Sequence, residues 1–179
     1  MARALIIVDF QNDFTPGGAL AVDEGDAIAG RVDSLARSGH FDLVVATRDW
    51  HPADHGSFAA QGGPWPPHCV QDTPGAEFHP ALDRTLVDAV ISTGYEPELE
   101  GYSGFERTDL AELLREHAID DVTMVGLATD YCVKHTALDA LALGFGVTVD
   151  STGVRPVEVE PGDGERALEE IRAAGGAVS

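Results

Sequence analysis

Two residues of this sequence, Asp9 and Cys132, have the chemistry of a base and a nucleophile. Asp9 directly follows the apolar run of residues 4–8, where a carboxylate costs free energy to bury unless it has a partner. Cys132 follows another apolar run and opens a helical pattern. There the helix dipole favours a thiolate, and free N–H groups can hold an oxyanion. Each residue also has a structural interpretation, Asp9 as the cap of a turn and Cys132 as a small core residue.

A group of histidines near Asp49 has the spacing of a metal site. In an extended segment Asp49 and His51 point to the same side, and His55 and His68 follow in the same loop-rich stretch, residues 48–80. Carboxylate and imidazole ligands suit Zn²⁺, Fe or Mn. The alternative interpretation is that these loop histidines are simply solvated.

Aromatic residues lie in or near the same irregular stretch. Phe14, Trp65 and Tyr102 could sandwich a flat ring. Each of them could equally pack in the core. An irregular stretch of this length is usually functional in a compact domain, which favours a ligand pocket in this region.

Alternating strand and helix patterns position these residues. They predict a single α/β domain over residues 1–179, a three-layer fold with a mainly parallel sheet of five to six strands and helices on both faces. The expected strands are 4–8, 43–47, 89–92, 122–125, 146–149 and 177–178, and the expected helices are 26–38, 109–117, 130–143 and 161–174. Ligands bind such sheets at the carboxyl ends of the strands. Asp9, Asp49, Thr93 and the segment after Val125 all fall at such ends.

The composition excludes several classes of protein. The chain has 179 residues, of which 44 % are hydrophobic, so it can form a core, and no apolar run is long enough to span a membrane. Eleven basic residues face 31 acidic ones, a formal net charge of −20, which disfavours binding to nucleic acids and to anionic membranes. No apolar segment near the start is long enough for a signal peptide. We therefore expect a cytoplasmic enzyme or binding domain with no disulfide between Cys69 and Cys132.

Six short segments of the sequence resemble motifs of the nicotinamidases, also called pyrazinamidases, in the isochorismatase-like cysteine hydrolase superfamily. They appear in the same order as in that family and cover nearly the whole chain. The segments are VDFQNDF (8–14), TRDWHP (47–52), WPPHCV (65–70), GAEFHP (75–80), YSGF (102–105) and GLATDYCV (126–133).

The resemblance implies a hydrolase that converts nicotinamide, and pyrazinamide, to the acid and ammonia. Cys132 would be the nucleophile that forms a thioester, and Asp9 its base. A cis peptide bond between Leu127 and Ala128 would turn the Ala128 N–H toward the Cys132 N–H to form an oxyanion hole.

The resemblance also implies the ligands of the site. Asp49, His51 and His68 would bind one divalent metal ion, zinc in the first place and otherwise iron or manganese. His55 matches an additional ligand that some family members use. The pocket for a pyridine carboxamide would be lined by Phe14, Trp65, Tyr102 and Tyr131, and the family is often homo-oligomeric.

One position departs from the family pattern. The family has a catalytic lysine at the end of the third strand, where this sequence has Thr93. The only lysine, Lys134, follows Cys132 by two positions, about 200° around a helix, and should point away from the thiol. A cation about 4 Å from a thiolate contributes about 4 kcal/mol at an effective dielectric of about 20. We therefore expect a raised Cys132 pKa, a protonated Asp9 and a hydrogen bond from Thr93 to Asp9 or to water.

Three alternatives to a nicotinamidase remain open at this point. The site could hydrolyse another small amide or ester, or it could be an isochorismatase-type hydrolase of a vinyl ether, which needs no metal. The chain could also be a catalytically impaired homologue that binds a pyridine-like ligand. A dinucleotide-binding oxidoreductase is disfavoured, because no G-x-G-x-x-G motif follows the first strand.

The charge composition leads to a testable prediction about salt. An acid-rich surface with a single lysine suits a high-salt cytoplasm, where salt screens the repulsion between carboxylates. Under this hypothesis the chain unfolds at low salt and is stabilised in molar KCl, which circular dichroism at both salt concentrations would detect. Equal stability at both concentrations would favour the other explanation for the missing lysines, a high-GC genome.

Overall fold

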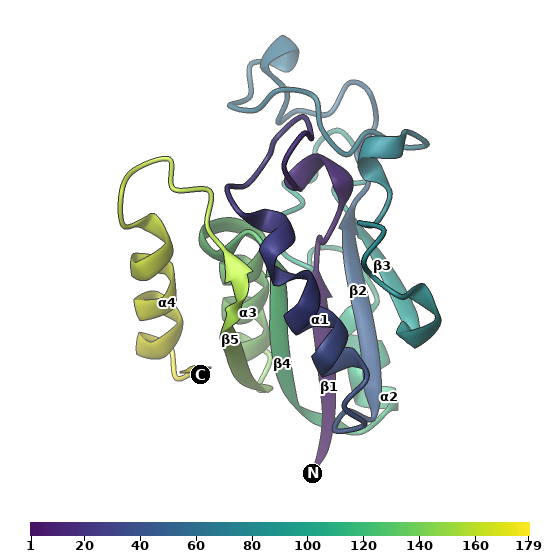
Figure 1. Cartoon of the computed structure of the whole chain (residues 1–179), viewed down its shortest axis with the longest axis vertical. Helices are drawn as coiled ribbons and strands as arrows, with labels where there is room; N and C mark the ends of the chain where they lie inside the picture. Colours follow the sequence, from purple (N-terminus) through teal and green to yellow (C-terminus); the bar gives the residue numbers. More distant parts are fainter.

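The computed structural model describes residues 1–179 and contains one six-stranded sheet in which every pair of neighbouring strands is parallel. The strand order is β3-β2-β1-β4-β5-β6 (Figure 1). The strands are β1 (Ala2–Val8), β2 (Leu43–Asp49), β3 (Ala89–Thr93), β4 (Ile119–Leu127), β5 (Gly146–Arg155) and β6 (Ala177–Val178). The strand order reverses direction between β1 and β4, which is where sheets of this kind bind their ligands.

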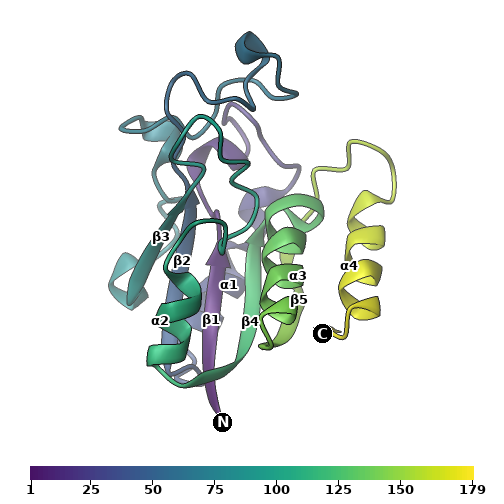
Figure 2. The same cartoon turned by 180° about the vertical axis from the view of Figure 1, so that it is seen from behind.

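Helices cover both faces of the sheet, as the sequence predicts. The helix α1 (Ala29–Ala36) lies on one face (Figure 1), and α2 (Leu110–Glu116) and α3 (Lys134–Ala142) lie on the other (Figure 2). The helix α4 (Asp163–Ala173) packs beside α3, and its Ile171 joins the core on that second face. The predicted three-layer fold is confirmed.

The central strand β1 contributes to both cores by alternation. Ala4, Ile6 and Val8 face the core under α2, α3 and α4, whereas Leu5 and Ile7 face the core under α1. All five are at most 1 % exposed. A strand covered on both faces needs apolar residues at every position, so the unbroken run of residues 4–8 is explained by burial on both sides.

Several predicted boundaries were wrong because of local backbone geometry. The helix predicted at 130–143 begins with a π-helical turn, Thr129–Val133, before α3. The helix predicted at 161–174 starts only at Asp163, because Gly162 has a φ of +88°, which is left-handed backbone. The helix predicted at 26–38 opens with a 3-10 turn, Gly25–Ile28, before α1.

The strands predicted at residues 122–125 and 146–149 were too short. The strand β4 extends the predicted 122–125 in both directions, and β5 continues from the predicted 146–149 to Arg155 through polar residues. A shift in register between Met124 and Gly126 lets β5 bend and resume pairing at Val154. None of the helices is long and apolar enough to cross a membrane.

The bend in β5 is stabilised by one buried carboxylate, Asp150. One oxygen of Asp150 accepts hydrogen bonds from the backbone and the hydroxyl of Thr152, and the other accepts one from Arg31 Nε of α1 at 2.9 Å. Burial opposes ionisation here, but the bonds from Arg31 and Thr152 outweigh it and lower the pKa of Asp150 below its ordinary 3.8. A lowered native pKa stabilises the fold above pH 4 and ceases to do so as the pH falls through that native value.

We predict that Asp150→Asn lowers the melting temperature at pH 7 by about 2–4 °C, equivalent to about 1 kcal/mol. The effect is moderate because the Arg31 side chain is 44 % exposed. Thermal unfolding followed by circular dichroism from pH 7 to pH 3 should show the difference from the wild type shrinking below pH 4. Asp33→Asn, which breaks an exposed pair with Arg37, serves as control and should shift the melting temperature by less than about 1 °C. A difference that does not change with pH would contradict the assignment.

Candidate active site and metal centre

The carboxyl edge of the sheet brings the predicted chemical residues together. Asp9 follows β1, Asp49 ends β2 and Thr93 ends β3, and Asp49 and Thr93 are directly paired in the register of the two strands. Cys132 lies in the turn after β4. All four side chains belong to residues that are at most 5 % exposed. Parallel strands that end together therefore create a buried polar cluster from distant parts of the chain.

Asp9 and Cys132 are placed to exchange a proton. Their reactive atoms and a carboxylate oxygen of Asp49 all lie within 4.8 Å of one another. The hydroxyl of Thr47 donates a 2.7 Å hydrogen bond to Asp9. Burial and the nearby Asp49 charge raise the pKa of Asp9 from 3.8 to about 8. Burial and Asp9 also raise the pKa of the Cys132 thiol. Both shifts have the direction expected from the sequence for a site without a lysine.

The hydrogen bond predicted from Thr93 to Asp9 was wrong, and the alternative bond to a water stays a prediction. Its hydroxyl lies 3.1 Å from Asp49 Oδ1 and 3.2 Å from the carbonyl of Arg48, and it makes no bond to Asp9. The reason is the strand order, since β3 neighbours β2 and only β2 neighbours β1. A short threonine side chain reaches the adjacent strand but not the next one. Lys134, as expected, points away from the thiol and lies 3.4 Å from Glu170 of α4.

Asp49, His51 and His68 form a compact group of metal-ligating side chains. Asp49 Oδ2 lies 3.1 Å from His51 Nε2 and 3.6 Å from His68 Nε2. Two ligands at about 2.0–2.1 Å from a tetrahedral zinc ion are about 3.3 Å apart, so the spacing suits a divalent metal. The other ring nitrogens face carbonyl oxygens, His51 Nδ1 that of Gly94 at 2.9 Å and His68 Nδ1 that of Pro66 at 2.8 Å. Such partners fix the tautomer of a metal-binding histidine.

The charges in this group support the same interpretation. Burial opposes ionisation of Asp49, but the charge of His51 and its hydrogen bond outweigh burial and lower the pKa of Asp49. Burial likewise opposes the charged form of His51, and the interaction with Asp49 nevertheless raises its pKa. The carboxylate is therefore ionised and oriented, which a metal ligand must be.

The structure does not bring His55 into this group. Its Nδ1 faces Ser57 Oγ at 2.7 Å, and its Nε2 faces the carbonyl of Leu99 at 2.7 Å. Its ring packs against that of His51 with centroids 3.9 Å apart. In this conformation both nitrogens of His55 are engaged, and the residue supports the ring of His51.

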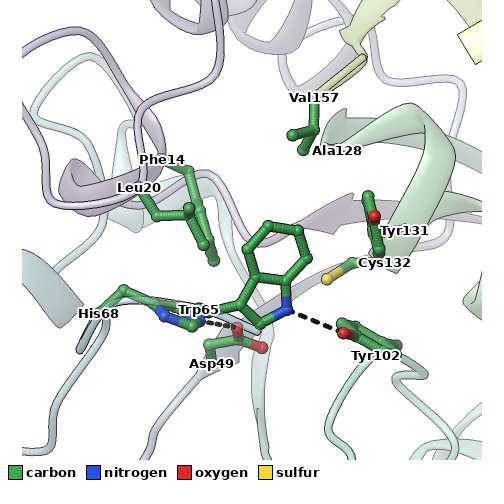
Figure 3. A pocket seen from close by; sticks show the side chains of 10 residues that line it. All are labelled: Phe14, Leu20, Asp49, Trp65, His68, Tyr102, Ala128, Tyr131, Cys132 and Val157. Carbon is green, nitrogen blue, oxygen red and sulfur yellow. Dashed lines mark hydrogen bonds and ion pairs between the residues drawn. The ribbon is translucent and has the colours of Figure 1, made fainter. Parts of the chain in front are cut away.

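A small pocket, partly open to solvent, lies next to the cluster (Figure 3). The four predicted pocket residues Phe14, Trp65, Tyr102 and Tyr131 all line it, together with Cys132. Trp65 Nε1 donates a 2.9 Å hydrogen bond to the hydroxyl of Tyr102, and Trp65 meets Tyr131 edge to face. The cavity is therefore an aromatic box with the thiol of Cys132 in its wall and Asp49 and His68 at one end (Figure 3).

The turn before Cys132 has the backbone geometry expected of an oxyanion site. The peptide bond between Leu127 and Ala128 is cis, as the resemblance implies. Ala128 lines the cavity, and its N–H donates no hydrogen bond within the chain. Gly126 precedes this bond with a φ of +124°, and a Cβ there would lie 2.0 Å from the carbonyl oxygen of Val8. Only glycine fits this position, because the backbone of β1 lies directly against it.

Sequence reasoning missed several residues that hold the site in place. Gln11 is fully buried, and its side-chain amide donates to the Asp49 carbonyl at 2.8 Å and accepts from the Asp49 N–H at 2.9 Å. Asp130 accepts the N–H groups of Val157 and Glu158, which places Val157 in the cavity wall. The only signal in the sequence for Gln11 was its place in the motif 8–14.

Comparisons with known proteins agree with this geometry. A family model described as the isochorismatase domain matches residues 3–179. The chain belongs to the isochorismatase family. It is 46 % identical over 183 residues to the nicotinamidase/pyrazinamidase of Mycobacterium tuberculosis, and the aligned region covers 96 % of this chain and 95 % of that protein. The resemblance to nicotinamidases read from the motifs is thereby confirmed.

Two solved structures of this family share the fold over essentially the whole chain. The pyrazinamidase of Pyrococcus horikoshii in complex with zinc matches with a TM-score of 0.89 and 49 % identity, covering 100 % of this chain and 99 % of that one. PnC1 from L. infantum in complex with nicotinate matches with a TM-score of 0.95 and 36 % identity, covering 99 % of this chain and 92 % of that one.

We predict that the chain binds one divalent metal ion through Asp49, His51 and His68. Zinc titration in competition with a chromophoric chelator should give a single site. His68→Ala should weaken binding by more than about 100-fold, since the loss of an outer partner alone costs about 10–100-fold. His55→Ala should cost less than His68→Ala, because the His55 ring supports that of His51 without being a ligand, and His117→Ala, at an exposed position, is the control that should stay within about threefold of the wild type. A loss of affinity in His55→Ala equal to that in His68→Ala would contradict the three-residue assignment.

Proposed function

We propose that this chain is a nicotinamidase and pyrazinamidase that hydrolyses the carboxamide of a pyridine or pyrazine ring to the acid and ammonia. The observation that carries the proposal is the position of Cys132 in the wall of an aromatic cavity, with Asp9 behind it and the metal-ligating group beside it. The names of the curated relatives and the nicotinate complex of a structural neighbour support the same substrate class.

The proposed reaction uses Cys132 as nucleophile and Asp9 as the proton carrier. Asp9, in its ionised form, takes the thiol proton, and the thiolate attacks the amide carbonyl to form a tetrahedral oxyanion. The proton then passes from Asp9 to the departing ammonia, which leaves a thioester on Cys132. Water then attacks the thioester while Asp9 takes a proton from it, the C–S bond breaks to release the acid, and Asp9 returns the proton to the departing thiolate of Cys132.

The oxyanion would be held by backbone N–H groups. The N–H groups of Ala128 and Cys132 belong to the turn that the cis peptide bond introduces. Preorganised donors of this kind stabilise the transition state more than the substrate, because the charge on oxygen develops only there. The first turn of the helical segment adds the positive end of its dipole.

The metal centre would act in positioning. A bound metal ion, which we propose to be zinc, would supply positive charge at this end of the cavity that attracts and orients the ring nitrogen of the substrate. Asp49, His51 and His68 are the ligands, and the aromatic cavity next to them orients the ring. The aromatic walls and the metal centre together place the carboxamide against Cys132.

Because Thr93 stands where the family pattern has a lysine, the proposed mechanism differs from that of family members with the lysine. Its hydroxyl contributes no positive charge, so the helix dipole and the metal ion remain as the positive groups near the thiol.

Two other functions fit the same residues less well. The second candidate is hydrolysis of another amide or ester with a better leaving group, because the chain retains the nucleophile Cys132 and the base Asp9. A site that only binds ligand is the third. A cytoplasmic location and a homo-oligomeric state stay predictions.

We predict that the zinc-loaded protein releases ammonia from nicotinamide and that Cys132→Ala lowers the rate by more than about 10³-fold, because the thioester cannot form. Thr93→Lys should raise turnover by restoring a cation next to the thiol. A coupled ammonia assay on the three proteins tests both statements.

The control outcomes separate the three candidate functions. Unchanged nicotinate production in Cys132→Ala would contradict the thioester mechanism. Inactivity of the wild type with activity of Thr93→Lys would identify a scaffold that lacks one charge. Inactivity of all three proteins, with nicotinamide still bound, would favour the ligand-binding function.

A further inference from the structure

The two carboxylate oxygens of Asp49 have different surroundings. Oδ2 faces His51 Nε2 at 3.1 Å and His68 Nε2 at 3.6 Å, and it is the oxygen turned toward the proposed metal position. Figure 3 shows the contact between Asp49 and His68 at the end of the cavity. Oδ1 instead lies 3.1 Å from the hydroxyl of Thr93. The carboxylate is thus held between a pair of histidines and a threonine.

Thr93 is rigidly placed to make this contact. It is 1 % exposed, it pairs with Asp49 in the register of β2 and β3, and its carbonyl accepts the Trp50 N–H at 2.9 Å. The hydroxyl has one proton and two acceptors within reach, Asp49 Oδ1 at 3.1 Å and the Arg48 carbonyl at 3.2 Å. A hydrogen bond to a carboxylate is about twice as strong as one to a neutral acceptor, so Asp49 is the preferred partner.

The backbone of Asp49 is fixed independently, by Gln11 at 2.8 and 2.9 Å. These backbone contacts leave the side-chain torsions of Asp49 free, and the terminal torsion, which sets the direction of each carboxylate oxygen, has a broad energy profile. His51 and His68 can restrain only one oxygen. The contact with Thr93 restrains the other, so it decides which way Oδ2 points when the histidines are free to bind an ion.

We propose that Thr93 is a positioning residue of the metal centre: its hydroxyl holds Asp49 Oδ1 and thereby directs Oδ2 to the ion shared with His51 and His68. This inference rests on the proposed metal centre. It gives the residue at the end of β3 a function in metal binding. Partners that orient a metal-ligating carboxylate typically change metal affinity by about 10–100-fold when they are removed.

The test compares zinc affinity in four proteins by competition with a chromophoric chelator. Thr93→Val removes the hydroxyl at nearly constant volume and should weaken zinc binding by about 10–100-fold. Thr93→Ser keeps the donor and should stay within about threefold of the wild type. Thr136→Val is the matched control, because Thr136 is also fully buried, and its hydroxyl accepts a hydrogen bond from Gly104 N–H away from the metal centre. It should leave zinc affinity unchanged.

Each outcome decides the inference. Equal zinc affinity in Thr93→Val and the wild type would overturn it, and so would an equal loss in Thr93→Ser, which would indicate packing of the methyl group as the cause. Should Thr93→Val fail to fold, Thr93→Ala replaces it, with melting temperatures in chelator reporting the stability of the metal-free protein. Absence of zinc binding in the wild type would overturn the metal centre itself, whereas wild-type binding that Thr93→Val leaves intact would overturn only the role of Thr93.

Discussion

Two carboxylates buried next to each other, Asp9 and Asp49, impose the constraint on which the rest of the site depends. Atoms of both lie within 4.8 Å of the Cys132 thiol, and no lysine or arginine forms an ion pair with either of them. Two like charges in a buried site cannot both be ionised without compensation. The two carboxylates have different surroundings, and their pKa values therefore shift in opposite directions. The charge of His51 and hydrogen bonds lower the pKa of Asp49, whereas burial raises that of Asp9.

Under the proposed function, this difference divides the site into a part for metal binding and a part for proton transfer. Asp49 is clamped by Gln11 through its backbone and faces His51, His68 and Thr93 through its side chain. Asp9 accepts a hydrogen bond from Thr47 and faces the thiol. Carboxylates whose environments push their pKa values apart are typical of paired acid and base functions. A bound cation would further stabilise the ionised forms of both.

The sequence by itself determined the architecture and most of the chemical residues. The unbroken apolar run at residues 4–8 required a strand buried on both faces, and the alternation of strands and helices required a parallel sheet with crossovers. Because the carboxyl ends of parallel strands meet at one edge, the positions of Asp9, Asp49 and Cys132 at such ends were enough to predict that they come together. The aromatic wall of the cavity, Phe14, Trp65, Tyr102 and Tyr131, also followed from the motifs.

Only the tertiary structure decided which partner each polar group has. Thr93 bonds Asp49 because β3 lies beside β2, a fact about strand order that the spacing along the chain does not contain. His55 supports the ring of His51 and bonds Ser57 and Leu99, since the loop that carries it folds back to the sheet edge. Gln11 and Val157 entered the site through contacts with distant segments. Hydrogen bonds are directional and of short range, so they depend on three-dimensional placement that apolar periodicity cannot specify.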